Sequence, residues 1–283
     1  MRQVCTRYCS GIMLMIGLLA HGPLSSQAGA AEVIKVGGMG TALGSMRQII
    51  AAFEKRYPGT AVRLMPSVGS SGAIKAVAEG ALDIGLVGRP LKPEEQNPGL
   101  LVMEYARTPF VFAVNKSVKT PGLTSDDLVR IYRGEMQTWP NGERIRVVLR
   151  PFSDADTIFA RTISPEMSAA IDDALAREGM IMAATNQECH DILDRTPGSL
   201  GFSSLTQILT EEHPLRPLTY NGTAPSVKAI AKGTYPLVKT LSLLTRAKQT
   251  PAVRRFVSFV LSAEGKAILE RTGNLPSTGR SGN

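Results

Sequence analysis

The sequence has few cysteines, no long hydrophobic run and no concentrated block of charge. Its 283 residues include three cysteines, and no stretch reaches the roughly 18 apolar residues that a membrane-spanning helix needs. The formal net charge is +8, yet no run of four Lys or Arg occurs. These absences argue against a membrane-spanning protein and against nucleic-acid binding, which favours basic patches interleaved with aromatic residues.

The residues of hydrolytic and metal sites are scarce as well. After the first thirty residues only His190 and His213 remain, and no Gly-x-Ser-x-Gly motif is present. Cys189 shares a helical face with Ile192 and Leu193, so we interpret it as a core residue rather than a thiolate or metal ligand. The paired carboxylates lack His or Cys partners at metal-ligand spacing. We therefore expect a protein that is not an enzyme and that holds no metal or other cofactor.

The first thirty residues have the pattern of an export signal. Two arginines precede an apolar stretch at residues 12–20, and Ala28-Gly29-Ala30 fits an A-x-A cleavage site. Cys5 and Cys9 precede the apolar stretch, whereas a lipid-attachment cysteine would follow it. We expect cleavage of the signal peptide at residues 1–30 and a free secreted protein, in which the single remaining cysteine cannot form an internal disulfide.

The remaining chain alternates strand and helix signals. Residues 33–36 form a short predicted strand, a glycine-rich turn follows at residues 37–41, and apolar residues then recur at i, i+3, i+4 and i+7 up to Tyr57. The same order continues, with further helices predicted at residues 73–79, 125–133, 166–177, 186–194, 252–261 and 263–271. This order predicts an α/β fold, divided into two lobes because single cores stop growing near this chain length.

Three predicted loops of small and hydroxyl-bearing residues each precede a helix. They contain Thr41, the pair Ser70 and Ser71, and the segment from Ser153 to Thr157. Helix N-termini expose unpaired N–H groups and the positive end of the helix dipole, which suits oxyanions. Arg150, at the end of a predicted strand, offers a guanidinium for bidentate contact. The alternatives are that the hydroxyls cap their helices and that Arg150 forms a salt bridge.

Ordered segments across the chain resemble one protein family. They include Ser70-Ser71-Gly72, Asp83-Ile84-Gly85 with Arg89-Pro90-Leu91, Ile131-Tyr132-Arg133-Gly134, Val147-Val148-Leu149-Arg150, and residues 196–202, 235–237 and 259–265. Through them the chain resembles the periplasmic phosphate-binding proteins of ABC importers, which have the type II solute-binding fold. The resemblance implies two lobes, each a mixed sheet flanked by helices, with the ligand cleft between them.

The resemblance also implies the partners, and two apolar runs without turn residues, at residues 110–114 and 241–245, indicate the lobe boundaries. We expect one lobe at residues 32–112 plus 243–283 and the other at 113–242, joined by strands at 110–114 and 241–245. The implied function is the capture of a small oxyanion, phosphate by default, by a monomer that delivers it to an ABC permease. The alternative is a receptor or interaction protein with a changed, non-phosphate ligand that docks to a membrane sensor.

The ligand-binding residues implied by the resemblance are Thr41, Ser70, Ser71, Arg150, Ser153, Asp154, Asp156 and Thr157. Two positions depart from the family pattern. The family's proton-accepting Asp falls at Gly88, and its Ser-Gly-Thr falls at Asp154-Ala155-Asp156, or at Ser153 and Thr157 if the loop is shifted. A carboxylate about 4 Å from phosphate would cost about 4 kcal/mol per charge pair at an effective dielectric of about 20. Asp154 capping its own helix is the alternative.

Overall fold

A computed structural model of the chain describes residues 32–211 and 213–277. The expected export signal and its cleavage site lie outside these residues. Within them, no helix is long and apolar enough to cross a membrane.

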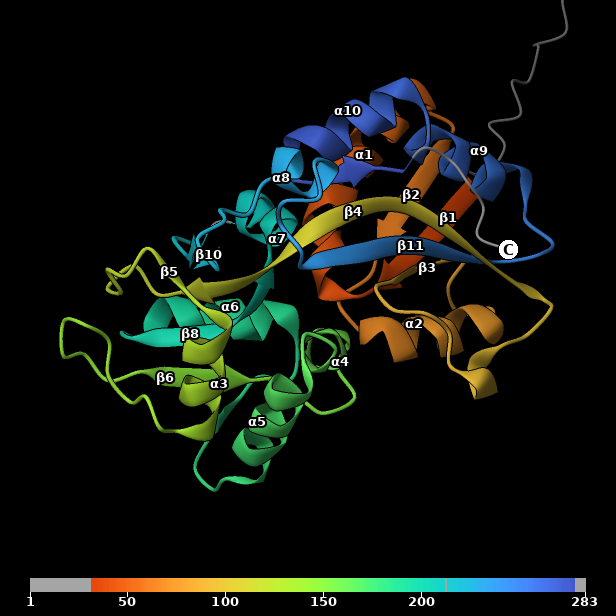
Figure 1. The fold of residues 1–283 in the computed structure, drawn as a ribbon. Helices are drawn as coiled ribbons and strands as arrows, with labels where there is room; N and C mark the ends of the chain where they lie inside the picture. The colour runs from red at the N-terminus through yellow and green to blue at the C-terminus, as the bar shows by residue number, and fades with distance from the viewer. Residues whose placement is uncertain (1–31, 212, 278–283) are drawn as a thin grey trace, which may run out of the picture. The chain divides into compact units, whose positions relative to one another are not determined.

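The first part of the chain and its last helices share one core. The sheet order is β2-β1-β3-β11-β4, in which β1 pairs parallel with β2 and β3, and β11 pairs antiparallel with β3 and β4. Helices α1, α9 and α10 pack their apolar sides on one face of this sheet, and α2 packs on the other (Figure 1). The elements are β1 (Glu32–Gly38), η1 (Gly40–Ala42), α1 (Leu43–Arg56), β2 (Thr60–Leu64), α2 (Gly69–Ala78), β3 (Ile84–Val87), η2 (Pro93–Glu95), β4 (Leu100–Val114), β11 (Val238–Arg246), α9 (Pro251–Val260), α10 (Ala263–Arg271) and β12 (Leu275–Pro276).

The middle of the chain forms a second core. Its strand order is β4-β8-β6-β7, with β6 parallel to β7 and β8. Helices α3 and α5 cover one face of this sheet, where they share a core with Phe110, Phe112 and Phe202 of the strands. Helix α6 covers the other face. The elements are β5 (Gly122–Leu123), α3 (Ser125–Arg133), β6 (Arg146–Leu149), α4 (Ala155–Arg161), α5 (Pro165–Ala176), β7 (Ile181–Met182), α6 (Asn186–Arg195), β8 (Ser199–Ser204), α7 (Leu205–Thr210), β9 (Arg216–Pro217), β10 (Thr219–Tyr220) and α8 (Val227–Ala231).

Strand β4 belongs to both sheets. Its residues up to Pro109 pair with β11, and Phe110–Val114 pair with β8. Figure 1 shows β4 and β11 side by side where they leave the first core. These two strands include the segments 110–114 and 241–245 that the sequence indicates as connections. The boundaries proposed for the lobes remain a prediction.

Local sequence signals account for several helix ends. Thr124 caps α3 by accepting from Asp127 N, and Gly134 ends that helix at a φ of 79°, a conformation that glycine adopts without strain. The predicted start of α2 at residue 73 is wrong, because the helix begins at Gly69 and includes both serines in its first turn. Small residues can take up the first helical turn as readily as a loop, so composition alone did not separate the two.

Candidate functional site

A cleft of about 280 Å³ lies between the start of α2 and the segment that follows β6. One side is formed by residues 67–71, and the other by Arg150, Pro151, Ser153–Ala155, Ala184 and Thr185. The cleft therefore brings together five of the predicted ligand-binding residues, Ser70, Ser71, Arg150, Ser153 and Asp154. The other three, Thr41, Asp156 and Thr157, are buried outside this lining.

Arg150 is held in the wall of the cleft by contacts within the protein. Its side chain is 2% exposed. Nη1 donates to the carbonyl oxygen of Ala183 at 2.8 Å, and Nη2 donates to Asp154 Oδ2 at 2.6 Å. Nε has no hydrogen-bond partner among the described residues. The guanidinium is thus fixed in place, and the N–H group of Nε is among its donors that have no partner within the described residues.

Asp154 caps its own helix, which the sequence analysis gave as the alternative to ligand binding, and it also pairs with Arg150. It is the N-cap of α4, where Oδ1 accepts from Asp156 N at 2.9 Å, and its other oxygen pairs with Arg150. Its side chain remains 13% exposed. Thr157 Oγ1 donates to the carbonyl oxygen of Arg150 at 3.2 Å and so supports the backbone behind the guanidinium. The positive charge of Arg150 is therefore balanced by a carboxylate of the chain itself.

Asp156 turns away from the cleft into a buried polar cluster. It forms an ion pair with Lys239 of β11, and the two side chains are 2% and 1% exposed. Asn186 Nδ2 donates to Asp156 Oδ2 at 2.5 Å and to Thr41 Oγ1 at 3.4 Å. Burial lowers the pKa of Lys239 to about 8, an effect that nearby Asp154 opposes and Arg150 reinforces. The contact with Asp156 favours the charged form of this lysine.

Sequence reasoning missed Lys239 and Asn186. The signal for Lys239 is its register: it shares the buried side of β11 with Leu241 and Leu243, so strand alternation places its side chain inside. Asn186 follows the helix cap Thr185 and carries no comparable signal.

The serines at the start of α2 contact the segment after β3. Ser70 Oγ accepts from Gly88 N at 3.1 Å, and Ser71 Oγ accepts from Arg89 Nη2 at 2.8 Å. Arg89 is paired with Glu95 at 2.6 Å, and its hydrogen bond is the main cause that lowers the pKa of that carboxyl. A Cβ atom at Gly88 would lie 2.5 Å from Met39 Cε, so Met39 fills the space that a larger residue at this position would need.

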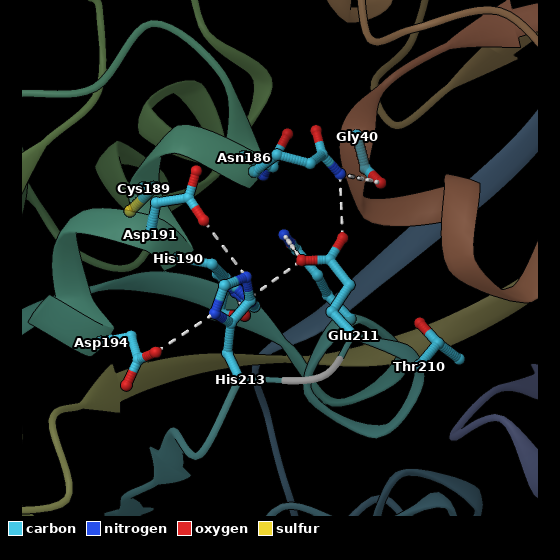
Figure 2. A network of polar contacts seen from close by, with 12 residues as sticks. Gly40, Asn186, Cys189, His190, Asp191, Asp194, Thr210, Glu211 and His213 are labelled. Carbon is cyan, nitrogen blue, oxygen red and sulfur yellow. Dashed lines mark hydrogen bonds and ion pairs between the residues drawn. The ribbon is translucent and has the colours of Figure 1, made fainter.

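A second polar network includes His190 and Glu211 (Figure 2). His190 Nε2 and Ser203 Oγ are 2.6 Å apart and share a hydrogen bond, and His190 Nδ1 lies 3.1 Å from Glu211 Oε2. Glu211 also accepts from Gln187 Nε2 at 2.9 Å, and the same Nε2 donates to the carbonyl oxygen of Gly40. This network links α6 and the end of α7 to η1.

The order Ser203, His190, Glu211 is that of a hydrolase triad, but burial prevents this use. Ser203 is 1% exposed and His190 is fully buried, so a substrate cannot reach the serine hydroxyl in this structure. Cys189 is fully buried, as predicted, and burial raises the pKa of its thiol to about 12. Within residues 32–211 and 213–277, no group of three His, Cys, Asp or Glu could hold a metal ion.

Comparison with known proteins gives the family. A model of the PBP superfamily domain matches residues 25–264, which is most of the chain. The chain belongs to the PBP superfamily. The family is one of substrate-binding proteins. The predicted resemblance, the α/β class and the two-lobed type II periplasmic binding fold are confirmed.

Members of the PBP superfamily similar to this chain include two curated proteins. The phosphate-binding protein PstS of Borreliella burgdorferi is 24% identical over 251 residues, which cover 86% of this chain and 90% of the relative. PstS of Bacillus subtilis is 25% identical over 242 residues, covering 81% and 77%. A crystal structure with bound phosphate, of a Clostridium perfringens protein assigned as a phosphate ABC transporter substrate-binding protein, shares the fold with a TM-score of 0.75. Its identity is 18%, and the match covers 87% of this chain and 100% of that one.

Proposed function

We propose that this protein is the solute-binding component of a phosphate-type ABC importer and that it captures a small oxyanion in the cleft. The two PstS relatives match over most of their length and are named for phosphate binding. In this proposal the lobes are residues 32–112 plus 243–283 and residues 113–242. The monomeric protein works in the periplasm, after removal of residues 1–30, and delivers its solute to a permease.

The observation that carries the proposal is the position of α2 opposite Arg150. Helix α2 has ten residues, and its N-cap, Val68, offers no side-chain cap. The first N–H groups of a helix have no partner within the helix, so those of Gly69, Ser70 and Ser71 are available to an oxyanion. Arg150 lines the opposite side of the same cleft, and its Nε has no hydrogen-bond partner among the described residues. Donors from both sides thus converge on a solute held between them.

One observation favours the alternative, a receptor whose ligand differs from phosphate and which docks to a membrane sensor. Asp154 lines the cleft and occupies Nη2 of Arg150, so a phosphate ion would approach a carboxylate as well as the guanidinium. At a separation of about 4 Å and an effective dielectric of about 20, each such charge pair costs about 4 kcal/mol. That is close to the gain from the arginine itself.

Calorimetric titration with phosphate tests the proposal on the wild type and on Arg150→Ala. Loss of a charged partner from a desolvated site costs about 2 to 5 kcal/mol, so the variant should bind at least about thirtyfold more weakly. Arg47→Ala removes an exposed arginine of α1 and serves as the control for net charge. Equal affinity of Arg150→Ala and wild type would contradict oxyanion binding in this cleft.

A further inference from the structure

We propose that the solute of this cleft is an oxyanion that also carries an ammonium group, and that Asp154 is the residue that selects it. The inference rests on the proposed function, because it assumes that the cleft binds an oxyanion. It goes further by assigning the chemical class of the solute.

The ionisable residues that line the cleft balance each other in charge. Among the described residues that line it, Arg150 and Asp154 are the ionisable ones, and they form an ion pair at 2.6 Å. The lining therefore has no net charge, although the whole chain carries +8. An ammonium group lowers the net negative charge of an oxyanion solute, so such a solute leaves less unbalanced charge out of water in this lining.

The cations next to the cleft are likewise each paired with a carboxylate of the chain. Lys239 is paired with Asp156 behind the wall, and Arg89, which donates to Ser71 of the lining, is paired with Glu95. Both cations have side chains no more than 5% exposed. Neither therefore supplies the excess positive charge that a doubly charged anion needs.

The cleft offers hydrogen-bond acceptors as well as hydrogen-bond donors. The uncapped start of α2 and the guanidinium of Arg150 are donors, which suit the oxyanion end of a solute. Each oxygen of Asp154 accepts one hydrogen bond within the protein, and a carboxylate has about four acceptor sites in total. The exposed part of this carboxylate can thus accept from an ammonium group.

The cleft is larger than a phosphate ion needs. The cleft of about 280 Å³ is roughly nine times the volume of one water molecule in the liquid, which is about 30 Å³. Inorganic phosphate has five heavy atoms and would leave much of this space to water. A solute with a short chain between the oxyanion and the ammonium group can reach from α2 to Asp154.

The test compares three probes by calorimetry at about pH 7.5: inorganic phosphate, ethylphosphonate and 2-aminoethylphosphonate. The last two differ by the amino group alone. We expect the wild type to bind 2-aminoethylphosphonate at least about tenfold more tightly than ethylphosphonate. In Asp154→Asn the preference should disappear, and phosphate should bind more tightly than in the wild type because Arg150 loses its internal counter-charge.

Asparagine caps helices about as well as aspartate, so this variant should keep the start of α4 intact. Asp126→Asn, an exposed carboxylate in the first turn of α3, is the matched control and should leave all three affinities unchanged. Equal binding of the two phosphonates by the wild type would overturn the inference, as would a preference that survives in Asp154→Asn. If phosphate binds through Arg150 without any preference for the amino group, the inference alone fails. If the folded protein binds none of the probes, the proposed function fails with it.

Discussion

Replacing Lys239 by methionine should destabilise the protein strongly, because it leaves a buried carboxylate without its cation. Lys239 and Asp156 are 1% and 2% exposed, and the remaining partner of Asp156 Oδ2 is the neutral amide of Asn186 at 2.5 Å. Removing one member of a buried ion pair typically costs about 3 to 5 kcal/mol. Methionine is unbranched and similar in length to the lysine stem, so the loss reflects charge more than volume.

The loss of stability in Lys239→Met should lower the melting temperature and should depend on pH. For a domain of 150 to 250 residues, 1 kcal/mol corresponds to about 2 to 4 °C, so Lys239→Met should melt roughly 6 to 20 °C below the wild type at neutral pH. Without its cation, buried Asp156 should have a pKa above that of an unfolded aspartate. The folded variant then binds a proton more readily than the unfolded chain, so its stability falls as pH rises and partly recovers as pH falls.

Thermal melts followed by circular dichroism, at about pH 7.5 and about pH 5, measure both effects. Lys228→Met, an exposed lysine of α8, is the matched control. Adding Asp156→Asn to Lys239→Met removes the stranded charge and should restore part of the lost melting temperature. The reasoning is refuted if Lys239→Met lowers the free energy of unfolding by less than about 1 kcal/mol, or if its deficit is the same at both pH values.

Three further predictions follow from other parts of the molecule. Burial raises the pKa of Glu211, but contact with His190 and the amides of Gln207 and Gln187 outweighs this and leaves the pKa below its usual value. The resulting stability is present above an unfolded glutamate pKa of about 4.3 and is lost as pH falls, so urea unfolding of Glu211→Gln should show a shallower loss between about pH 5 and 3. Trp139→Ala removes a buried ring and its Nε1 bond to Gly198 O, and should cost about 3 to 5 kcal/mol in the same assay. Mass spectrometry of the exported protein should find an N-terminus near Ala31 or Glu32; an intact Met1 would contradict the predicted signal.

Features set by neighbouring residues could be predicted from the sequence. The helix predicted at residues 125–133 has the bounds of α3, between the cap Thr124 and Gly134, and the burial of Cys189 was predicted from its spacing with Leu193. Asp154 as the cap of α4 was among the stated alternatives. In each case the residues concerned are a few positions apart, so the sequence pattern itself indicates which of them lie together.

Contacts between distant parts of the chain could not be predicted in this way. Asp156 and Lys239 are 83 positions apart, and Asn186 and Thr41 are 145 apart. Each residue alone has ordinary surface roles, and only the packing of α4 and α6 against β11 and η1 decides that these four side chains meet. The sequence therefore indicated a candidate site but not which charges are already balanced within it.

The two aspartates of Asp154-Ala155-Asp156 show why that balance matters for the solute. They stand two positions apart at the start of α4, yet one lines the cleft and the other lies in the buried cluster. Each carboxylate brought into this position is matched by one cation, Arg150 for Asp154 and Lys239 for Asp156. Because Lys239 is committed to Asp156, replacing both aspartates by hydroxyl residues would strand a buried lysine, whereas replacing Asp154 alone frees Arg150 at the cleft. We therefore expect Asp154 to control the affinity of this cleft for anions, and the pair of Asp156 and Lys239 to control the stability of its wall.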